Sequence, residues 1–161
     1  MVVVVMGVSG TGKTVVGRML AANIGLPFLD ADDFHNPVHL EQMQQGEPLD
    51  DRDRAPWLDR LNHELRREAA LPFQGAVLAC SALKEEYRRR LAEGVPDVRF
   101  VHLTGPPELI RQRLHDRAEG IGPELLESQM ATLEPPLGAI TEDVSDPPEA
   151  VMHRVLDQLG A

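Results

Sequence analysis

The chain has few cysteines, no long apolar run and little positive charge, and each scarcity excludes a class of protein. Cys80 is the single cysteine, which excludes an internal disulfide and a zinc site built from several cysteines. The valine run after Met1 is too short to span a membrane and has no basic leader before it. We therefore expect a cytoplasmic protein with no membrane partner. We interpret Cys80 as a buried apolar residue and not as a nucleophile.

Charge and length narrow the class further. Lys and Arg number 16 against 26 Asp and Glu, which gives a formal net charge of −10. A duplex repels such an acidic surface, so we expect no nucleic-acid partner. With 161 residues, 42% of them hydrophobic, the chain suits one domain over residues 1–161.

What the chain does have is a glycine-rich segment between an apolar run and a helical pattern. The phosphate-binding pattern G-x-x-x-x-G-K-[ST] is matched in full by Gly7, Val8, Ser9, Gly10, Thr11, Gly12, Lys13 and Thr14. Glycines let successive backbone N–H groups point at phosphate oxygens, and the following helix N-terminus favours negative charge. Lys13 suits the β/γ phosphates, and the Thr14 hydroxyl suits Mg²⁺. These eight residues predict ATP binding.

Strand-like and helical patterns alternate along the rest of the chain. The predicted strands are Val2–Met6, Pro27–Leu29, Ala76–Cys80, Val98–Leu103 and Ala139–Val144. Asp53 is the predicted N-cap of a helix that carries Pro56 in its first turn, and Asp146–Glu149 resembles a capping box before the last helix. The alternation predicts an α/β fold of three layers, with a parallel five-stranded sheet flanked by helices. Ligands should bind beyond the carboxyl ends of the strands.

Three carboxylates follow the second predicted strand, in the sequence Asp30-Ala31-Asp32-Asp33. No asparagine is followed by lysine, so the guanine-reading element of GTPase switches is missing, and acids this early are typical of small-molecule kinases. Asp30 could hold Mg²⁺ through a water. Asp32, further along an extended segment, could accept the proton of the attacking hydroxyl, with Asp33 as the next candidate. A solvated acidic loop or a helix N-cap is the alternative.

Two histidines, His35 and His39, stand four residues apart and could share a helix face. No third metal ligand is evident near them in the sequence. We interpret both as residues of a solvated face.

Four blocks of the sequence resemble the gluconate kinase (gluconokinase) family. They are Asp30–His35, Gly46–Leu58 (G-x-P-L-x-D-x-D-R-x-P-W-L), Cys80–Arg88 (C-S-A-L-K-x-x-Y-R) and Leu125–Glu134 (L-L-x-S-Q-F-x-T-L-E, with Met130 in place of the Phe). The resemblance implies a P-loop kinase fold like that of shikimate kinase, often as a homodimer. It implies the conversion of ATP and D-gluconate to ADP and 6-phospho-D-gluconate, with Mg²⁺.

The resemblance also suggests residues that bind the sugar acid. Arg54 is the candidate clamp for its carboxylate, because a guanidinium pairs with a carboxylate through two parallel hydrogen bonds. The alternative for Arg54 is a surface ion pair with Asp50 or Glu47. Ser81 and Lys84, after the third strand, and Gln129, in the last block, complete the predicted substrate-binding set with Asp32.

A lid is expected over residues 113–124. Arg113 and Arg117 stand four apart on a predicted helix that leads into Glu119–Pro123, where the family usually has G-H-F-M-P. We assign Arg113 to ATP and Arg117, with Lys13, to the charge on the transferring phosphoryl group. A solvated basic face that includes Arg111 is the alternative.

Two other functions compete with a gluconate kinase. One is a kinase of the same fold that acts on another hydroxy acid such as shikimate, although Cys80-Ser81-Ala82 stands where shikimate kinases typically carry a glycine triplet. The other is a regulatory protein that binds ATP without turnover. The retained Lys13, Thr14, Asp30 and Asp32 argue against it.

Overall fold

The computed structural model describes residues 1–47, 49–116 and 123–161. Its sheet has five parallel strands in the order β2-β3-β1-β4-β5. They are β1 (Val2–Met6), β2 (Phe28–Asp30), β3 (Ala76–Ala79), β4 (Val98–Thr104) and β5 (Ile140–Asp143). The predicted fold is confirmed. The bounds of β1 match the prediction, and the last residue of each other strand differs by one position.

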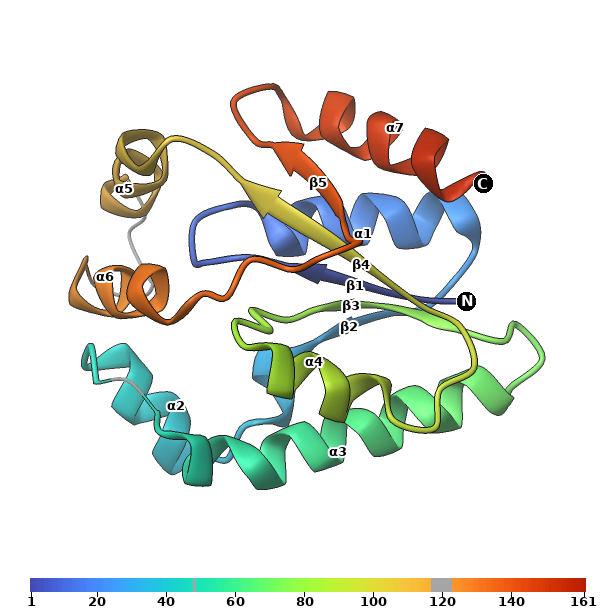
Figure 1. The fold of residues 1–161 in the computed structure, drawn as a ribbon, viewed down its shortest axis with the longest axis horizontal. Coiled ribbons are helices and arrows are strands. Elements are labelled where there is room, and N and C mark those ends of the chain that lie inside the picture. Colours follow the sequence, from blue (N-terminus) through green and yellow to red (C-terminus); the bar gives the residue numbers. More distant parts are fainter. Residues whose placement is uncertain (48, 117–122) are drawn as a thin grey trace.

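The central strand shows why the domain has three layers. Every residue of β1 is buried, and successive side chains of a strand point to opposite faces. Val2, Val4 and Met6 join one core cluster, beneath α3 (Asp51–Ala70) and α4 (Glu85–Ala92). Val3 and Val5 join the other, beneath α1 (Lys13–Ile24) and α7 (Pro148–Leu159). Figure 1 shows these two helix pairs on opposite sides of the sheet.

The remaining helices gather at the carboxyl end of the sheet (Figure 1). They are α2 (Pro37–Gln44), α5 (Pro107–His115) and α6 (Pro123–Thr132), together with the short 3₁₀ helix η1 (Ala31–Phe34). A third core cluster ties α5 and α6 to the phosphate-binding loop, through Ile110, Leu114, Leu126 and Val8. The expected ligand edge of the sheet is therefore enclosed by helices.

The predicted start of α3 was wrong by three residues. Asp50 is the N-cap, and its side chain accepts a hydrogen bond from the Asp53 backbone N–H at 2.7 Å. The Asp53 carboxylate accepts from the Asp50 N–H at 3.2 Å in return, so Asp53 closes a capping box instead of being the cap. Pro56 therefore lies inside the helix, beyond the first turn.

Two other helix ends differ from expectation. The N-cap of α7 is Pro147 and has no side-chain hydrogen bond, so the capping box predicted at Asp146–Glu149 is absent. Helix α2 was not predicted, because it buries no residue and so carries no apolar stripe. The Asn36 side chain starts it by accepting from the His39 N–H at 2.9 Å. Within the described part of the chain, no helix is long and apolar enough to cross a membrane.

Candidate active site

The phosphate-binding loop connects β1 to α1 in a curled backbone. Gly10 and Gly12 have φ of 86° and 87°, in the left-handed region that glycine adopts without strain. Helix α1 begins at Lys13, directly after the loop, so its free N–H groups face the loop. The Lys13 ammonium donates to the Val8 carbonyl at 3.0 Å, which folds its side chain back over the loop. This backbone fits the predicted ATP phosphates.

Helix α6 holds the loop from the side. The Ser9 N–H donates to the Gln129 side-chain carbonyl at 2.7 Å, a buried bond between residues 120 positions apart. Gln129 therefore holds the loop with its amide oxygen. The lone pair that accepts from Ser9 is not available to a substrate.

The two predicted metal ligands lie next to each other. The Thr14 hydroxyl donates to the Asp30 carboxylate at 3.3 Å, between the start of α1 and the end of β2. Mg²⁺ prefers a few oxygen ligands and keeps several waters, so a hydroxyl, a carboxylate and phosphate oxygens fit it. Within the described residues, no group of three or more His, Cys, Asp or Glu could form an all-protein metal site. Such a pair suits a metal that arrives with the phosphates.

Asp32 lies in η1, not on the extended segment that was predicted. The Asp30 carboxylate accepts from the Asp32 N–H at 3.0 Å, and this N-cap turns the chain into the 3₁₀ helix. Desolvation by the surrounding protein is the main cause that raises the pKa of Asp32. The Asp30 charge raises this pKa further, and the Lys13 charge lowers it. A carboxylate with a raised pKa is a better proton acceptor.

One cavity brings most of the predicted site residues together. Its lining includes ten of them: Ser9, Gly10, Gly12, Lys13, Thr14, Asp30, Asp32, Arg54, Ser81 and Gln129. They come from the loop, β2, η1, α3, α6 and the segment after β3. Sequence segments up to about 120 residues apart thus converge at the carboxyl end of the sheet, as the parallel topology requires.

Five other predicted residues lie outside this lining. Gly7, Val8 and Thr11 are buried residues of the loop itself, and the Thr11 hydroxyl donates to the Val8 carbonyl at 2.9 Å. Lys84 pairs with Asp51 at 3.0 Å. Arg113 donates to the Val144 carbonyl at 2.6 Å.

The predicted lid helix was expected to carry both arginines. Helix α5 ends at His115, which leaves Arg113 in its last turn. Arg117 and residues 118–122 of the predicted lid lie outside the described residues.

His35 contradicts the expectation of a solvated histidine pair. It lines the cavity, is only 9% exposed, and stacks on Trp57 with ring centroids 4.0 Å apart. Trp57 is fixed in turn by its indole N–H, which donates to the Ala31 carbonyl at 2.7 Å. Burial, and then the His39 and Arg54 charges, lower the pKa of His35 to about 4. The ring is therefore neutral near pH 7. His39 lies on α2, and its Nε2 is 3.7 Å from Oδ1 of Asp53.

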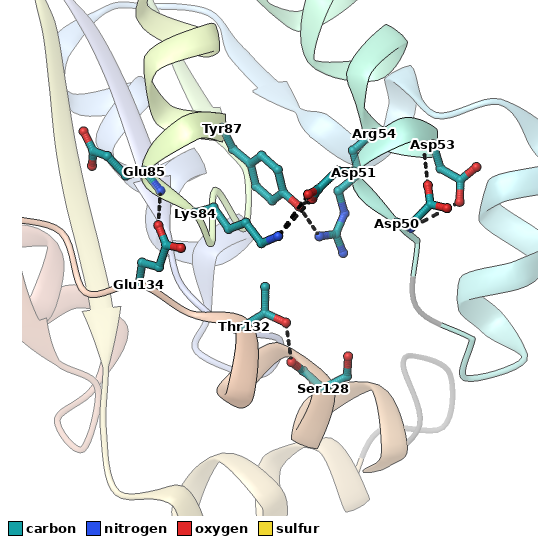
Figure 2. A network of polar contacts seen from close by, with 10 residues as sticks. All are labelled: Asp50, Asp51, Asp53, Arg54, Lys84, Glu85, Tyr87, Ser128, Thr132 and Glu134. Atoms are coloured by element: carbon teal, nitrogen blue, oxygen red, sulfur yellow. Dashed lines mark hydrogen bonds and ion pairs between the residues drawn. The ribbon is translucent and has the colours of Figure 1, made fainter.

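Arg54 reaches the cavity from the first turns of α3. Its guanidinium donates to the Tyr87 hydroxyl at 3.0 Å and lies over the Tyr87 ring, so it is not the surface ion pair considered as an alternative. Figure 2 shows Arg54, Tyr87, Asp51 and Lys84 pointing toward one another. The sequence block Cys80–Arg88 contains Tyr87, but we predicted no role in the site for it. Its position three residues after Lys84 was the available signal of a polar role.

The segment after β3 supplies the last side of the cavity. Ser81 lines it, and the N-cap of α4 is Lys84, so Ser81 does not cap that helix. Burial raises the pKa of the Cys80 thiol to about 12, which keeps it protonated. The interpretation of Cys80 as an inert buried residue agrees with this environment.

Comparisons with known proteins identify the family that this chain resembles. The AAA domain family matches residues 2–136. Gluconokinase from Gluconobacter oxydans (strain 621H) is 47% identical over 134 residues, which cover 83% of this chain and 75% of that protein.

Two solved structures are similar along nearly their whole length. An unliganded sugar kinase from Janibacter sp. HTCC2649 has a TM-score of 0.92 at 43% identity and covers 98% of this chain and 93% of that one. A gluconokinase from Sinorhizobium meliloti 1021 has a TM-score of 0.84 at 36% identity, covering 99% and 95%.

The fold, the loop and the cavity beside it, together with these relatives, define a P-loop kinase, an enzyme that binds ATP. The resemblance predicted from the sequence blocks is confirmed. The chain belongs to the gluconokinase family.

Proposed function

We propose that this enzyme transfers the γ-phosphoryl group of ATP to the 6-hydroxyl of D-gluconate. The observation that carries the proposal is that the phosphate-binding loop, Asp32 and Arg54 line one cavity. A phosphate cradle, a proton acceptor and a carboxylate clamp are what a reaction between ATP and a hydroxy acid requires. Membership of the gluconokinase family supports gluconate as that acid.

Each group has a distinct task in this proposal. The loop and the N-terminus of α1 orient the phosphates, and Lys13 stabilises the negative charge that moves during transfer. Asp32 accepts the proton of the attacking hydroxyl, helped by its raised pKa. Arg54 binds the substrate carboxylate through its planar fork and so fixes which end of the sugar acid faces ATP.

Thr14 and Asp30 would hold Mg²⁺, and their 3.3 Å contact supports a shared ligand. When bound, Mg²⁺ neutralises charge on the phosphate oxygens. Arg113 and Arg117 remain candidates for the nucleotide and the transferring phosphoryl group. For Arg113, this requires that its bond to the Val144 carbonyl be released.

We further propose that the enzyme acts in the cytoplasm, and that it forms a homodimer, as the family resemblance implies. Light scattering coupled to size-exclusion chromatography measures the mass directly. A mass near twice the 17.8 kDa of one chain is expected, and 17.8 kDa alone would reject the dimer.

A panel of acceptors tests the reaction itself. ADP release is measured with ATP, Mg²⁺ and one acceptor at a time: D-gluconate, other sugar acids, shikimate and the uncharged polyol sorbitol. We expect turnover to be highest with gluconate and very low with sorbitol. Higher turnover with shikimate would favour a different acceptor. ATP binding without turnover on any acceptor would favour the regulatory alternative.

A further inference from the structure

Four residues form a polar cluster beside the cavity. One of them lines the cavity, and the other three lie outside its lining. Arg54 lines the cavity, and its Nη1 donates to the Tyr87 hydroxyl at 3.0 Å. The Tyr87 hydroxyl donates in turn to the Asp51 carboxylate. Lys84 Nζ donates to both oxygens of Asp51, at 3.0 and 3.2 Å. Figure 2 shows this chain of contacts, which runs from α4 to the first turn of α3.

Asp51 is a potential competitor for the substrate carboxylate. It stands three residues before Arg54 on α3, and side chains at this spacing are neighbours on a helix surface. An Asp carboxylate and a gluconate carboxylate present the same two oxygens to a guanidinium fork. If Asp51 paired with Arg54, the clamp would be occupied by the protein's own acid.

The structure keeps Asp51 occupied elsewhere. Tyr87 and Lys84 supply three hydrogen bonds to its two oxygens, and the bonds from Tyr87 and then Lys84 lower the pKa of Asp51. Tyr87 is 4% exposed, and its ring lies beneath both cations, 5.3 Å from Arg54 and 5.6 Å from Lys84. The Tyr87 hydroxyl therefore lies between Arg54 and Asp51 in the chain of hydrogen bonds, because it accepts from the arginine and donates to the aspartate.

We propose that Asp51, Lys84 and Tyr87 are positioning residues that keep the guanidinium of Arg54 available to the carboxylate of the sugar acid. Lys84 acts through Asp51 and does not contact the substrate. Tyr87 holds Arg54 through its hydroxyl, and the proton of that hydroxyl occupies one oxygen of Asp51. This inference rests on the proposed function and replaces the direct substrate role predicted for Lys84.

The sharpest test compares Lys84→Met with the double variant Asp51→Asn/Lys84→Met. Removing Lys84 alone frees Asp51 to pair with Arg54, and we expect the KM for gluconate to rise about fivefold to tenfold. The KM for ATP should change far less. Removing the Asp51 charge as well should return the gluconate KM to within about twofold of wild type.

Direct contact between Lys84 and the substrate makes the opposite prediction. The double variant would then bind gluconate as weakly as Lys84→Met, and that result would overturn the inference. If the wild-type enzyme does not turn over gluconate, the proposed function is overturned as well. A wild type that is active on gluconate, combined with an unrescued double variant, would overturn the positioning role alone.

Arg90→Met is the matched control. Arg90 on α4 pairs with Asp59 on α3 at 2.9 Å, so this variant also removes an ion pair between the two helices, but away from the cavity. We expect no change in the KM for gluconate. A rise equal to that of Lys84→Met would mean that both variants act by loosening α4 from α3, which overturns the inference.

Tyr87→Phe gives a second, independent measurement in case the double variant does not fold. It keeps the ring but removes the hydroxyl, and we expect the gluconate KM to rise by about fivefold to tenfold. In an Arg54→Ala background the same change should have no further effect, because the group it positions is gone. Additive effects of the two substitutions would overturn the positioning role of Tyr87.

Discussion

The two sides of the cavity are built in different ways. The phosphate side comes from eight consecutive residues, 7–14, and from the end of the neighbouring strand β2. The acceptor side is assembled from Arg54 on α3, Ser81 after β3 and the His35–Trp57 stack. Its supports are Lys84, the N-cap of α4, and Tyr87 within that helix, which lies 33 residues from Arg54 along the chain. One side is thus local in sequence, whereas the other exists only when α3 and α4 pack together.

This difference separates chemistry from specificity. The phosphate side relies mainly on backbone N–H groups and one lysine, so it can serve any acceptor placed beside it. The acceptor side relies on side chains whose orientation depends on neighbours, such as the Tyr87 hydroxyl that holds Arg54 at 3.0 Å. Substitutions on the first side should therefore reduce turnover on every acceptor, and substitutions on the second should change which acceptor is bound.

Lys13→Ala should have the largest effect, because it removes the cation that neutralises the transferring group. We expect phosphoryl transfer to be abolished with every acceptor that the wild type uses. The folded state should persist, since Lys13 lies at the start of α1 and is only partly buried. ADP release and a thermal melt measure both points. Near wild-type turnover would mean that Lys13 and its loop take no part in catalysis.

Asp32→Asn should be next in size, with a fall in kcat of about 10²- to 10⁴-fold. ATP binding should persist, because the amide keeps the shape of the side chain. The raised pKa of Asp32 also predicts that the acid limb of kcat/KM lies above the ordinary range of an aspartate. The carboxylate accepts a proton only when ionised, so activity is lost as pH falls through this pKa.

Asp33→Asn is the matched control, since Asp33 follows in the same 3₁₀ helix but lies outside the cavity lining. It should retain most of the activity and the acid limb. If Asp33→Asn is the more damaging of the two, the base has been assigned to the wrong carboxylate.

The same contrast explains what could be predicted from the sequence. The loop, the five parallel strands and the acids after β2 were predicted because each depends on neighbours in the chain. Helix α2 was not, because it buries no residue and leaves no periodic signal. The burial of His35 was also missed, since its partner Trp57 is 22 residues away and no local pattern links them. The pairing of Lys84 with Asp51 could not be predicted either, because it is a tertiary contact between residues 33 positions apart.

Arg54→Ala tests the acceptor side directly. Losing a charge-assisted pair costs about 1.5–3 kcal/mol, so the KM for gluconate should rise about ten- to 150-fold. The KM for ATP should stay within a few-fold of wild type. Arg54→Lys keeps the charge but not the planar fork, and should recover only part of the affinity. An equal rise in both KM values would make Arg54 a structural residue and remove the contrast between the two sides.

His35 allows the acceptor side to be tested without substrate, through stability, and we expect the smallest effect here. Its pKa is about 4 in the folded protein, below the ordinary 6.5 of histidine. Between these values the unfolded chain binds a proton that the folded protein does not, so stability falls as pH decreases from 6.5 to 4. Above pH 6.5 this contribution is fully present.

His35→Phe keeps a ring against Trp57 but has no group that titrates. Its melting temperature should therefore fall less than that of wild type when the pH is lowered from 7 to 4.5, with about 2–4 °C for each kcal/mol of difference. His63→Phe, at an exposed position of α3, is the matched control and should retain the wild-type slope. Parallel slopes for wild type and His35→Phe would mean that His35 protonates as easily in the folded protein as in the unfolded chain. The neutral, stacked ring would then no longer be part of the acceptor side, whose shape would depend on Trp57 and the Arg54–Tyr87 contact.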